Sequence, residues 1–255
     1  MFYYNNYVRP ASLDEAYELA QTKNNVVLGG MLWLKMQNVN KGTAIDLCDL
    51  GLDYINQEED GIHIGAYTSL RKLESDETIC NVTNGAMKEA LKHIVGVQFR
   101  NVATLGGSIW GRFGFSDVLT IFMAIGARVK LYKAGEMSIE EFANMPRDIR
   151  DILVEVIIPA ADRQTVYMSQ RNSQTDFPVL TCAICKMDNE VKVAIGARPH
   201  KAVIVDISDK QLSDTDAIAE YVAGNVVFGS NYRGGAAYRR KVCTTIVRRA
   251  VSALQ

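Results

Sequence analysis

The chain has few of the side chains from which most active sites are built. Its 255 residues include three histidines, five cysteines and two tryptophans. No H-E-x-x-H, G-x-S-x-G or EF-hand pattern is present, which argues against a zinc protease, an α/β-hydrolase and a calcium-binding hand. The cysteine count is odd, which does not suggest a secreted disulfide framework, and the cysteines lack the usual ferredoxin spacings. We therefore expect no catalytic triad, metal site or iron–sulfur cluster in this chain.

An excess of charge and long apolar runs are also missing. Lys and Arg number 28 and Asp and Glu number 29, so the net charge of −1 argues against binding nucleic acid through phosphate neutralisation. The longest nearly apolar run, residues 118–127, is too short to cross a bilayer, and residues 1–10 lack the apolar core of a signal peptide. The sequence thus predicts a cytoplasmic globular protein with no membrane span.

The sequence does contain a mixture of short helical and strand patterns. A capping box at residues 12–15 predicts the start of a helix. Further helices are predicted at 84–95, from 116, at 214–223 and at 232–253. Strands are predicted at 26–28, 44–47, 62–66, 127–132, 152–158, 179–187, 191–196 and 203–207. Residues 96–104 are expected to be irregular, and a domain boundary is expected near residue 160.

Two segments share one design, a short apolar strand that runs into a pair of glycines. The first ends in Gly29-Gly30 and the second in Gly106-Gly107. Glycine permits positive φ and close approach of the backbone, and consecutive N–H groups in such turns can converge on an anion such as a pyrophosphate. Neither segment has the spacing of a dinucleotide-binding G-x-G-x-x-G or of a P-loop. The alternative is that the glycine pairs only turn the chain, and the spacing alone names no ligand.

Polar side chains surround the second glycine pair. Thr104, Ser108 and Ser116 add hydroxyl groups, and Asp117 begins an apolar helix. A carboxylate at this point could accept hydrogen bonds from sugar or ribityl hydroxyls. The residues therefore leave two interpretations open, a site for a phosphorylated, hydroxyl-bearing ligand and a plain turn.

Two further patterns have structural explanations. Cys182 and Cys185 form a C-x-x-C spacing inside a predicted strand, where residues three apart face opposite sides, so we expect ordinary buried cysteines. The last predicted helix carries basic residues that form either a solvated face or a docking surface for an acidic partner. These are Arg239, Arg240, Lys241, Arg248 and Arg249.

The glycine segments resemble the flavin motifs of a known family. The segment 100–108 (RNVATLGGS), followed by Ser116-Asp117 and an apolar helix to Ala127, resembles the second flavin motif of the molybdenum hydroxylases. It is similar to their FAD-binding subunit or domain, as in xanthine dehydrogenase and carbon monoxide dehydrogenase. Leu28-Gly29-Gly30 with Met36 resembles the first motif. Segments 64–70, 152–159, 238–240 and 247–250 resemble other parts of the same subunit, so the likeness covers nearly the whole chain.

The resemblance implies an α+β fold of the molybdopterin dehydrogenase or vanillyl-alcohol-oxidase type. It implies one FAD-binding subdomain at residues 1–57 and a second at 58–160, with an extended FAD between them. A small α+β C-terminal domain at 161–255 would be built on a three-stranded antiparallel sheet.

The resemblance also implies the cofactor-binding residues. Backbone N–H groups of 28–33 and 104–108 would hold the pyrophosphate and ribityl chain, Asp117 would bind hydroxyls of the FAD, and Ile94 and Leu153 would pack against the cofactor. The full set is Leu28, Gly29, Gly30, Met31, Leu32, Trp33, Ile94, Thr104, Leu105, Gly106, Gly107, Ser108, Ser116, Asp117 and Leu153. FAD would be bound non-covalently, and no catalytic side chain and no metal ligand is expected.

The implied function is that of an electron-transfer subunit in a xanthine dehydrogenase-like oxidoreductase. A large partner subunit would hold the molybdenum cofactor, a small partner subunit would relay electrons through [2Fe–2S] clusters, and FAD in this chain would pass them to NAD⁺. The complex would be a dimer of heterotrimers.

The residues leave two alternatives open. One is a flavin-free structural subunit, because Met31 and Leu32 stand where family members often have a hydroxyl and an acid, and Arg112 lies where they have small residues. The other is a free-standing FAD oxidase, for which the sequence offers no pair of acid–base residues.

Overall fold

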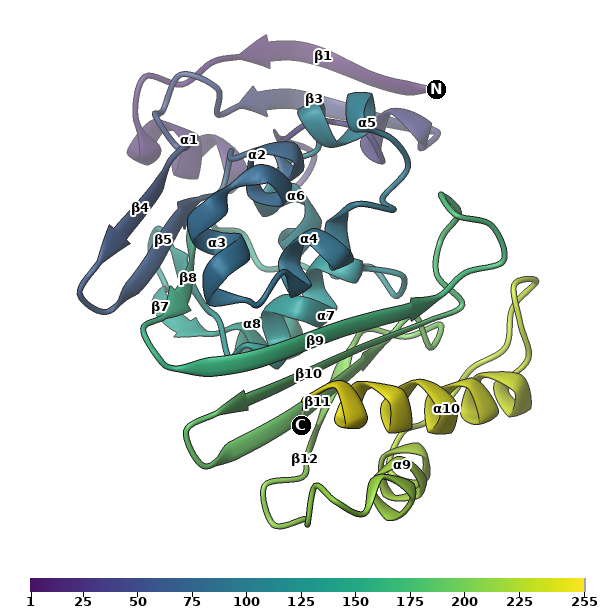
Figure 1. Ribbon diagram of the computed structural model, residues 1–255. Helices are drawn as coiled ribbons and strands as arrows, with labels where there is room; N and C mark the ends of the chain where they lie inside the picture. The colour runs from purple at the N-terminus through teal and green to yellow at the C-terminus, as the bar shows by residue number, and fades with distance from the viewer. Residues whose placement is uncertain (255) are drawn as a thin grey trace. The chain divides into compact units, whose positions relative to one another are not determined.

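The computed structural model describes residues 1–254, which divide into two compact units (Figure 1). The first unit contains residues 1–72, 97–111 and 128–159, and the second contains residues 73–96, 112–127 and the chain from residue 160 onward. Each unit is therefore assembled from segments that are far apart in the sequence. The three-domain division at 1–57, 58–160 and 161–255 stays a prediction.

The first unit begins with a parallel sheet in the strand order β1–β3–β2. Its strands are β1 (Phe2–Val8), β2 (Val26–Leu28) and β3 (Val39–Asp46). The predicted cap is present, since Ser12 accepts a hydrogen bond from the N–H of Glu15 at the start of α1 (Leu13–Ala20). Buried Ala16 of α1 packs against Ile45 of β3. A short 3₁₀ turn, η1 (Leu34–Met36), follows the first glycine pair.

An antiparallel sheet in the order β4–β5–β8–β6–β7 completes the strands of the first unit. They are β4 (Ile55–Glu58), β5 (Gly61–Gly65), β6 (Arg128–Leu131), β7 (Gly135–Ser138) and β8 (Leu153–Pro159). The other helices of this unit are α2 (Leu70–Ser75), whose end belongs to the second unit, α5 (Val97–Val102), α6 (Leu105–Trp110) and α8 (Ile139–Asn144). The expectation that 96–104 is irregular was wrong for α5, a six-residue helix with no side-chain cap in its sequence to reveal it.

The second unit contains a four-stranded antiparallel sheet in the order β12–β11–β10–β9. Its strands are β9 (Arg163–Gln170), β10 (Leu180–Met187), β11 (Glu190–Gly196) and β12 (Val203–Asp206), and its helices are α3 (Glu77–Val82), α4 (Ala86–Leu91), α7 (Asp117–Ala124), α9 (Thr215–Gly224) and α10 (Ala236–Leu254). The predicted hairpin is β10–β11. The prediction of three strands was wrong by one, because β9 is an edge strand whose polar residues hide the alternation of Val166 and Met168.

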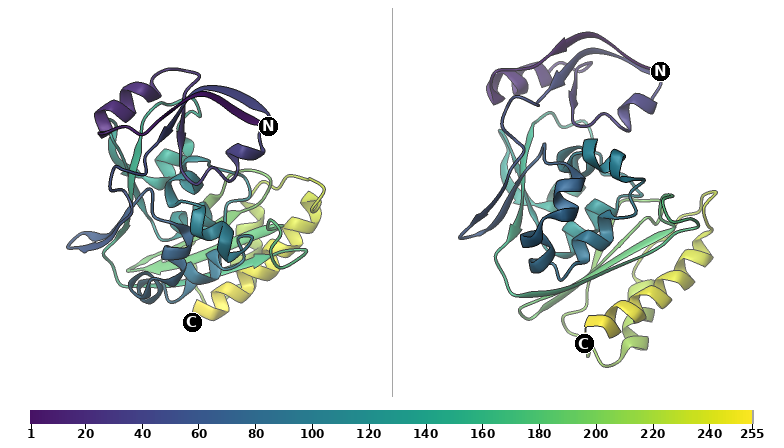
Figure 2. Two further views of the ribbon diagram at one scale, coloured as in Figure 1. Left: turned by 90° about the horizontal axis from the view of Figure 1, so that it is seen from above. Right: turned by 45° about the horizontal axis from the view of Figure 1, so that its top comes forward.

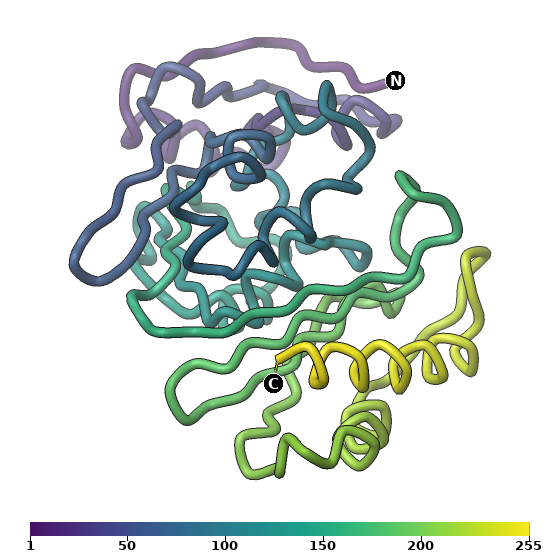
Figure 3. Tube along the Cα trace, in the orientation of Figure 1, coloured from purple at the N-terminus to yellow at the C-terminus, as the bar shows by residue number. Residues whose placement is uncertain are grey.

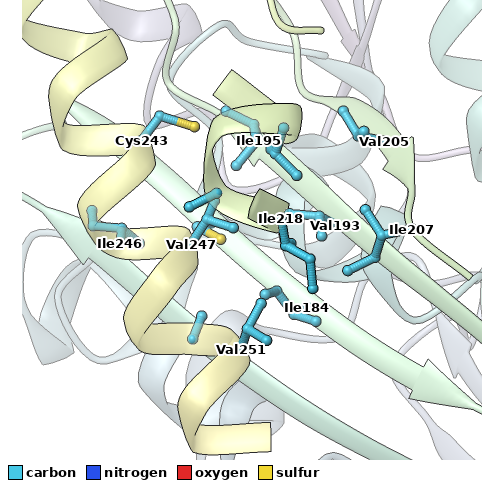
Figure 4. Packing of buried hydrophobic residues seen from close by; sticks show 14 of the residues in the cluster. Ile184, Val193, Ile195, Val205, Ile207, Ile218, Cys243, Ile246, Val247 and Val251 are labelled. Atoms are coloured by element: carbon cyan, nitrogen blue, oxygen red, sulfur yellow. The ribbon is translucent and has the colours of Figure 1, made fainter. Parts of the chain in front are cut away.

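Buried aliphatic side chains join this sheet to α9 and α10. Ile184 and Val193 of the sheet meet Val247 and Val251 of α10 and Ile218 of α9 in one cluster (Figure 4). In both turned views α10 runs along the sheet rather than away from it (Figure 2). No helix within residues 1–254 has the length and apolar character needed to cross a membrane.

The basic residues of α10 do not form one solvated face. Arg239 is 1% exposed, and its guanidinium donates hydrogen bonds to the carbonyls of Val179 and Gly229 at 2.9 Å each. Arg248 pairs with Asp216 on α9. Arg239 is therefore a core residue that fixes the loop before α10, whereas Lys241 and Arg249 lie on the exposed side of the helix.

The two cysteines of the C-x-x-C spacing lie on β10, as predicted, and both are buried. Cys182 belongs to the apolar cluster under α10, and Cys185 accepts a hydrogen bond from Thr165 of β9. Burial raises the pKa of both thiols. They are therefore unreactive packing residues rather than a redox pair.

His63 on β5 is part of an ionic network in the first unit. Its Nε2 atom lies 2.9 Å from a carboxylate oxygen of Asp60, and its Nδ1 atom lies 3.3 Å from Glu155, which is buried and also accepts from Tyr54 and Lys130. Burial alone would lower the pKa of His63, but the hydrogen bonds to Asp60 and Glu155 outweigh it and raise the pKa above 6.5. The folded protein therefore favours the charged imidazolium.

We expect His63 to make the stability of the chain depend on pH. Because its pKa is raised on folding, its contribution is fully present below about pH 6.5 and is lost as pH rises through the folded value. Urea unfolding at pH 6 and pH 9 should show wild type losing about 1 kcal/mol more over this range than His63→Gln, which keeps a donor but does not titrate. An identical pH dependence in the two proteins would contradict this role.

Candidate functional site

The first glycine turn leaves backbone N–H groups without protein acceptors. Strand β2 ends at Leu28, and the N–H groups of Gly30, Met31 and Leu32 donate to no acceptor within residues 1–254. All three residues are half-buried. Buried or half-buried amides are normally paired, so three consecutive free ones point to a ligand. An anion is the ligand that such a concavity of N–H groups binds.

Met31 gives this turn an unusual backbone. Its φ is 59°, in the left-handed region that a residue with a side chain seldom adopts. Strain of this kind persists where the surroundings impose it, and it concentrates at binding sites. The left-handed residue in the middle of the turn is what directs successive N–H groups toward one side.

The second glycine turn uses its N–H groups within the protein. Thr104 caps α6, and its hydroxyl accepts from the N–H of Gly107 at 3.1 Å. The N–H groups of Leu105, Gly106 and Ser108 donate to backbone carbonyls at 2.7–3.1 Å. These amides already donate within the protein, and the predicted contact of residues 104–108 with FAD stays a prediction.

The two glycine turns lie directly against each other in the first unit. A Cβ on Gly29 would come closer than 3.0 Å to the Thr104 hydroxyl, and one on Gly30 would come closer than 3.0 Å to the carbonyl oxygen of Val102. At Gly106 a Cβ would lie 2.7 Å from the carbonyl oxygen of Ala66. The expected close approach of the backbone is therefore present, but between protein segments. The expected positive φ was wrong, since none of the four glycines has one.

Asp117 lies in the second unit, at the start of α7, where Ser116 provides the cap. It is 5% exposed, and one carboxylate oxygen accepts both from the Tyr167 hydroxyl, at 2.5 Å, and from Arg171. Burial is the largest influence and raises the pKa of Asp117, although Arg171 and Tyr167 oppose it. The carboxylate thus already has protein partners, and its binding of FAD hydroxyls stays a prediction.

The remaining predicted residues differ in their surroundings. Leu153 on β8 is 5% exposed, while Trp33 is half-buried and packs at 5.2 Å, between ring centroids, on Phe99 of α5. Ile94 follows α4 in the second unit and is half-buried. Of the fifteen predicted residues, the structure brings together within the first unit those of the two glycine turns.

A cavity that the sequence did not reveal lies in the second unit. It has a volume of about 520 Å³, and its lining includes His93, Arg171 and Arg249, with hydroxyl and amide groups from the loop after β9. Burial, aided by Lys92 and Arg171, lowers the pKa of His93, so that imidazole is neutral near pH 7. Arg171 and Tyr167 were missed because no local pattern marks them. The only signal in the sequence was Asp117, because a buried carboxylate needs a cation such as Arg171 beside it.

The sequence comparison identifies the class of protein. The family model for the FAD binding domain in molybdopterin dehydrogenase matches residues 2–161, well over half of the chain. The chain therefore belongs to this family of FAD-binding domains, and it is part of an oxidoreductase.

Two curated relatives and one solved structure agree with this assignment. The glyceraldehyde dehydrogenase medium chain of Sulfolobus acidocaldarius is 26% identical, over 96% of each chain. The xanthine dehydrogenase FAD-binding subunit of Escherichia coli O157:H7 is also 26% identical, over 99% of this chain and 96% of its own. A chain of quinoline 2-oxidoreductase from Pseudomonas putida 86 shares the fold, with a TM-score of 0.84 at 20% identity, over 98% of this chain and 96% of its own.

Removing the Asp117 carboxylate should unfold the second unit early. In Asp117→Ala, Arg171 would stay buried without its counter-charge, which typically costs about 3–5 kcal/mol. Urea unfolding of Asp117→Ala, Arg171→Met and the double variant measures this. We expect the double variant to be more stable than the sum of the two losses predicts, by about 1–3 kcal/mol. Additive losses would show that the pair does not stabilise the unit as a pair.

Proposed function

We propose that this chain is the FAD-carrying electron-transfer subunit of a molybdenum hydroxylase. The observation that carries the proposal is the run of free N–H groups at Gly30, Met31 and Leu32, in a chain of the FAD-binding family. A pyrophosphate is an anion of the size that such a turn holds. The proposal includes non-covalent FAD bound between subdomains at 1–57 and 58–160.

The fit of this turn to FAD does not depend on its side chains. Met31 and Leu32 lack the oxygen atoms that a hydroxyl or an acid would offer, but backbone N–H groups bind phosphate whatever the side chain is. When bound, FAD supplies the exchange between one-electron transfer and hydride transfer. The contribution of this chain is to bind and orient that group, so the proposal needs no catalytic side chain.

We further propose that the molybdenum cofactor and the [2Fe–2S] clusters belong to a large and a small partner subunit, in a cytoplasmic dimer of heterotrimers. Two equally similar relatives are named for glyceraldehyde and for xanthine, which supports a substrate site outside this chain. Oxidation of a purine such as xanthine is the activity to assay first in the whole complex.

The proposed electron acceptor is NAD⁺. The cavity of about 520 Å³ in the second unit supports this choice, because its size is that of a small-molecule site and its arginines suit phosphate groups. Arg249 reaches the cavity from the exposed side of α10, and its side chain makes no hydrogen bond or ion pair within residues 1–254, unlike Arg171, which pairs with Asp117.

Gly30→Ala should lower FAD occupancy at least about tenfold. The new Cβ would collide with the Val102 carbonyl, so the turn must move and its N–H groups leave the phosphate, each such bond being worth about 1.5–3 kcal/mol. Gly107→Ala is the matched control, because its Cβ would meet only the Thr104 hydroxyl, at 3.1 Å.

The measurement is the FAD released by acid from each purified protein, with circular dichroism as a check of folding. Wild type and Gly107→Ala should release equal amounts of FAD, and Gly30→Ala much less. A colourless, folded wild type would instead favour the flavin-free structural subunit. Flavin that stays with the precipitate would contradict non-covalent binding.

NADH should bleach the flavin of the protein in stopped-flow experiments. Arg249→Ala should raise the NADH concentration for half-maximal bleaching rate severalfold, because one phosphate contact is lost. Lys241→Ala, on the same exposed side of α10 but outside the cavity lining, should leave it unchanged. Absence of bleaching in an intact complex would point to another acceptor, and equal effects of both variants would point to a general charge effect.

A further inference from the structure

Strand β1 forms an outer edge of the parallel sheet in the first unit. Within residues 1–254 it pairs with β3 alone, so alternate N–H and C=O groups on its other side have no strand beside them. The trace shows β1 running along the rim of its sheet (Figure 3). Its five central residues are exposed, with Tyr3 at 57%, Tyr4 at 43% and Tyr7 at 49%.

This edge lacks three of the features that normally prevent strand pairing. Soluble proteins protect edges with lysine, proline, a bulge or a covering element. The sequence of β1 is FYYNNYV, which contains no charge and no proline, and its register to β3 shows no bulge. An exposed, aromatic, uncharged strand of seven residues without a bulge is therefore available to pair with another strand.

We propose that two copies of this chain associate through antiparallel pairing of their β1 strands about a two-fold axis at Asn5. Asn5 is the central residue of β1, so the two seven-residue strands would align over their whole length. The proposal does not rest on flavin binding.

The geometry of antiparallel strands selects this register. In an antiparallel pair, two directly opposed residues either both direct their N–H and C=O groups toward the other strand or both direct them away. Along one strand this direction alternates from residue to residue. Opposed residues in a symmetric pair are therefore both odd-numbered or both even-numbered, and their numbers sum to an even number. A sum of ten sets Asn5 opposite Asn5 of the second copy, Tyr3 opposite Tyr7, and Phe2 opposite Val8. Tyr4 then lies opposite Asn6, and the outer pairs set aromatic and β-branched residues against one another, which is a favourable cross-strand combination.

A second copy suits this edge better than an unrelated strand does. An isologous contact requires a surface that complements itself, and β1 has Asn5 at its centre and aromatic or β-branched residues at both ends, so its two ends suit each other in the antiparallel pair. Because β1 carries no charge, bringing two copies together sets no like charges opposite each other.

The test uses charge at the axis. In Asn5→Lys, and separately in Asn5→Glu, like charges would face each other directly, so sedimentation velocity of the full chain should show monomers where wild type shows dimers. An equimolar mixture of the two variants should restore the dimer. Asn5→Gln, which adds no charge, is the control and should dimerise as wild type does. Asn5 is exposed, so the circular dichroism spectra of all three variants should match that of wild type and show that the fold is kept.

Three results would overturn the proposal. They are a monomeric wild type over the micromolar range, single charged variants that remain dimeric, and a mixture that stays monomeric. The first would mean that β1 is free or is covered by a different chain. The second would mean that the dimer forms elsewhere, and the third would mean that the charged variants act other than by repulsion across a two-fold axis.

Discussion

The candidate site depends on the direct contact between the two glycine turns of the first unit. Gly29 and Gly30 lie so near Thr104 and Val102 that no Cβ would fit. The end of β2 and the segment that leads into α6 are therefore held in one fixed arrangement. A larger residue would separate them, and the N–H groups of the first turn would move with the backbone. The glycines thus act through packing between protein segments, and they affect a ligand only through the position of the turn.

The two turns have different tasks, although their sequences look alike. The second turn directs its N–H groups inward, to Thr104 and to backbone carbonyls, and so anchors α6. The first turn leaves consecutive N–H groups unpaired, with Met31 at positive φ between its neighbours. Unpaired half-buried amides are costly to a fold unless something else pays that cost, and a bound anion does so. The strained, unsatisfied turn is thus the one that we propose as the binding element, and the satisfied turn supports it through packing.

Features of the fold and the candidate site that contiguous sequence patterns mark could be predicted, whereas features that depend on residues far apart in the sequence could not. The glycine turns, α7 and the β10–β11 hairpin are marked by contiguous patterns. Strand β9 was missed because it is a polar edge strand, identified by its partner β10 rather than by its own sequence. Arg171 and Tyr167 were missed because their role is to pair with a buried carboxylate, that of Asp117, which lies fifty or more residues away in the sequence. The prediction of a positive φ at the glycines was wrong because a glycine can be required either by a close approach of the backbone or by a positive φ. The sequence does not distinguish these two requirements.

In the second unit, buried charged side chains hold the backbone in position and take no part in a reaction that we propose. Asp117 is balanced by Arg171, whereas Arg239 is buried among backbone carbonyls, including those of Val179 and Gly229, and no carboxylate of residues 1–254 pairs with its guanidinium. Burial without an anionic partner lowers the pKa of Arg239, but an arginine stays charged even so, and a cation donating several hydrogen bonds fixes the loop that surrounds it. In both units, then, ionic and polar groups hold main-chain atoms in place. The proposed binding of FAD by backbone N–H groups would need this, because such binding is only as accurate as the backbone that presents those groups.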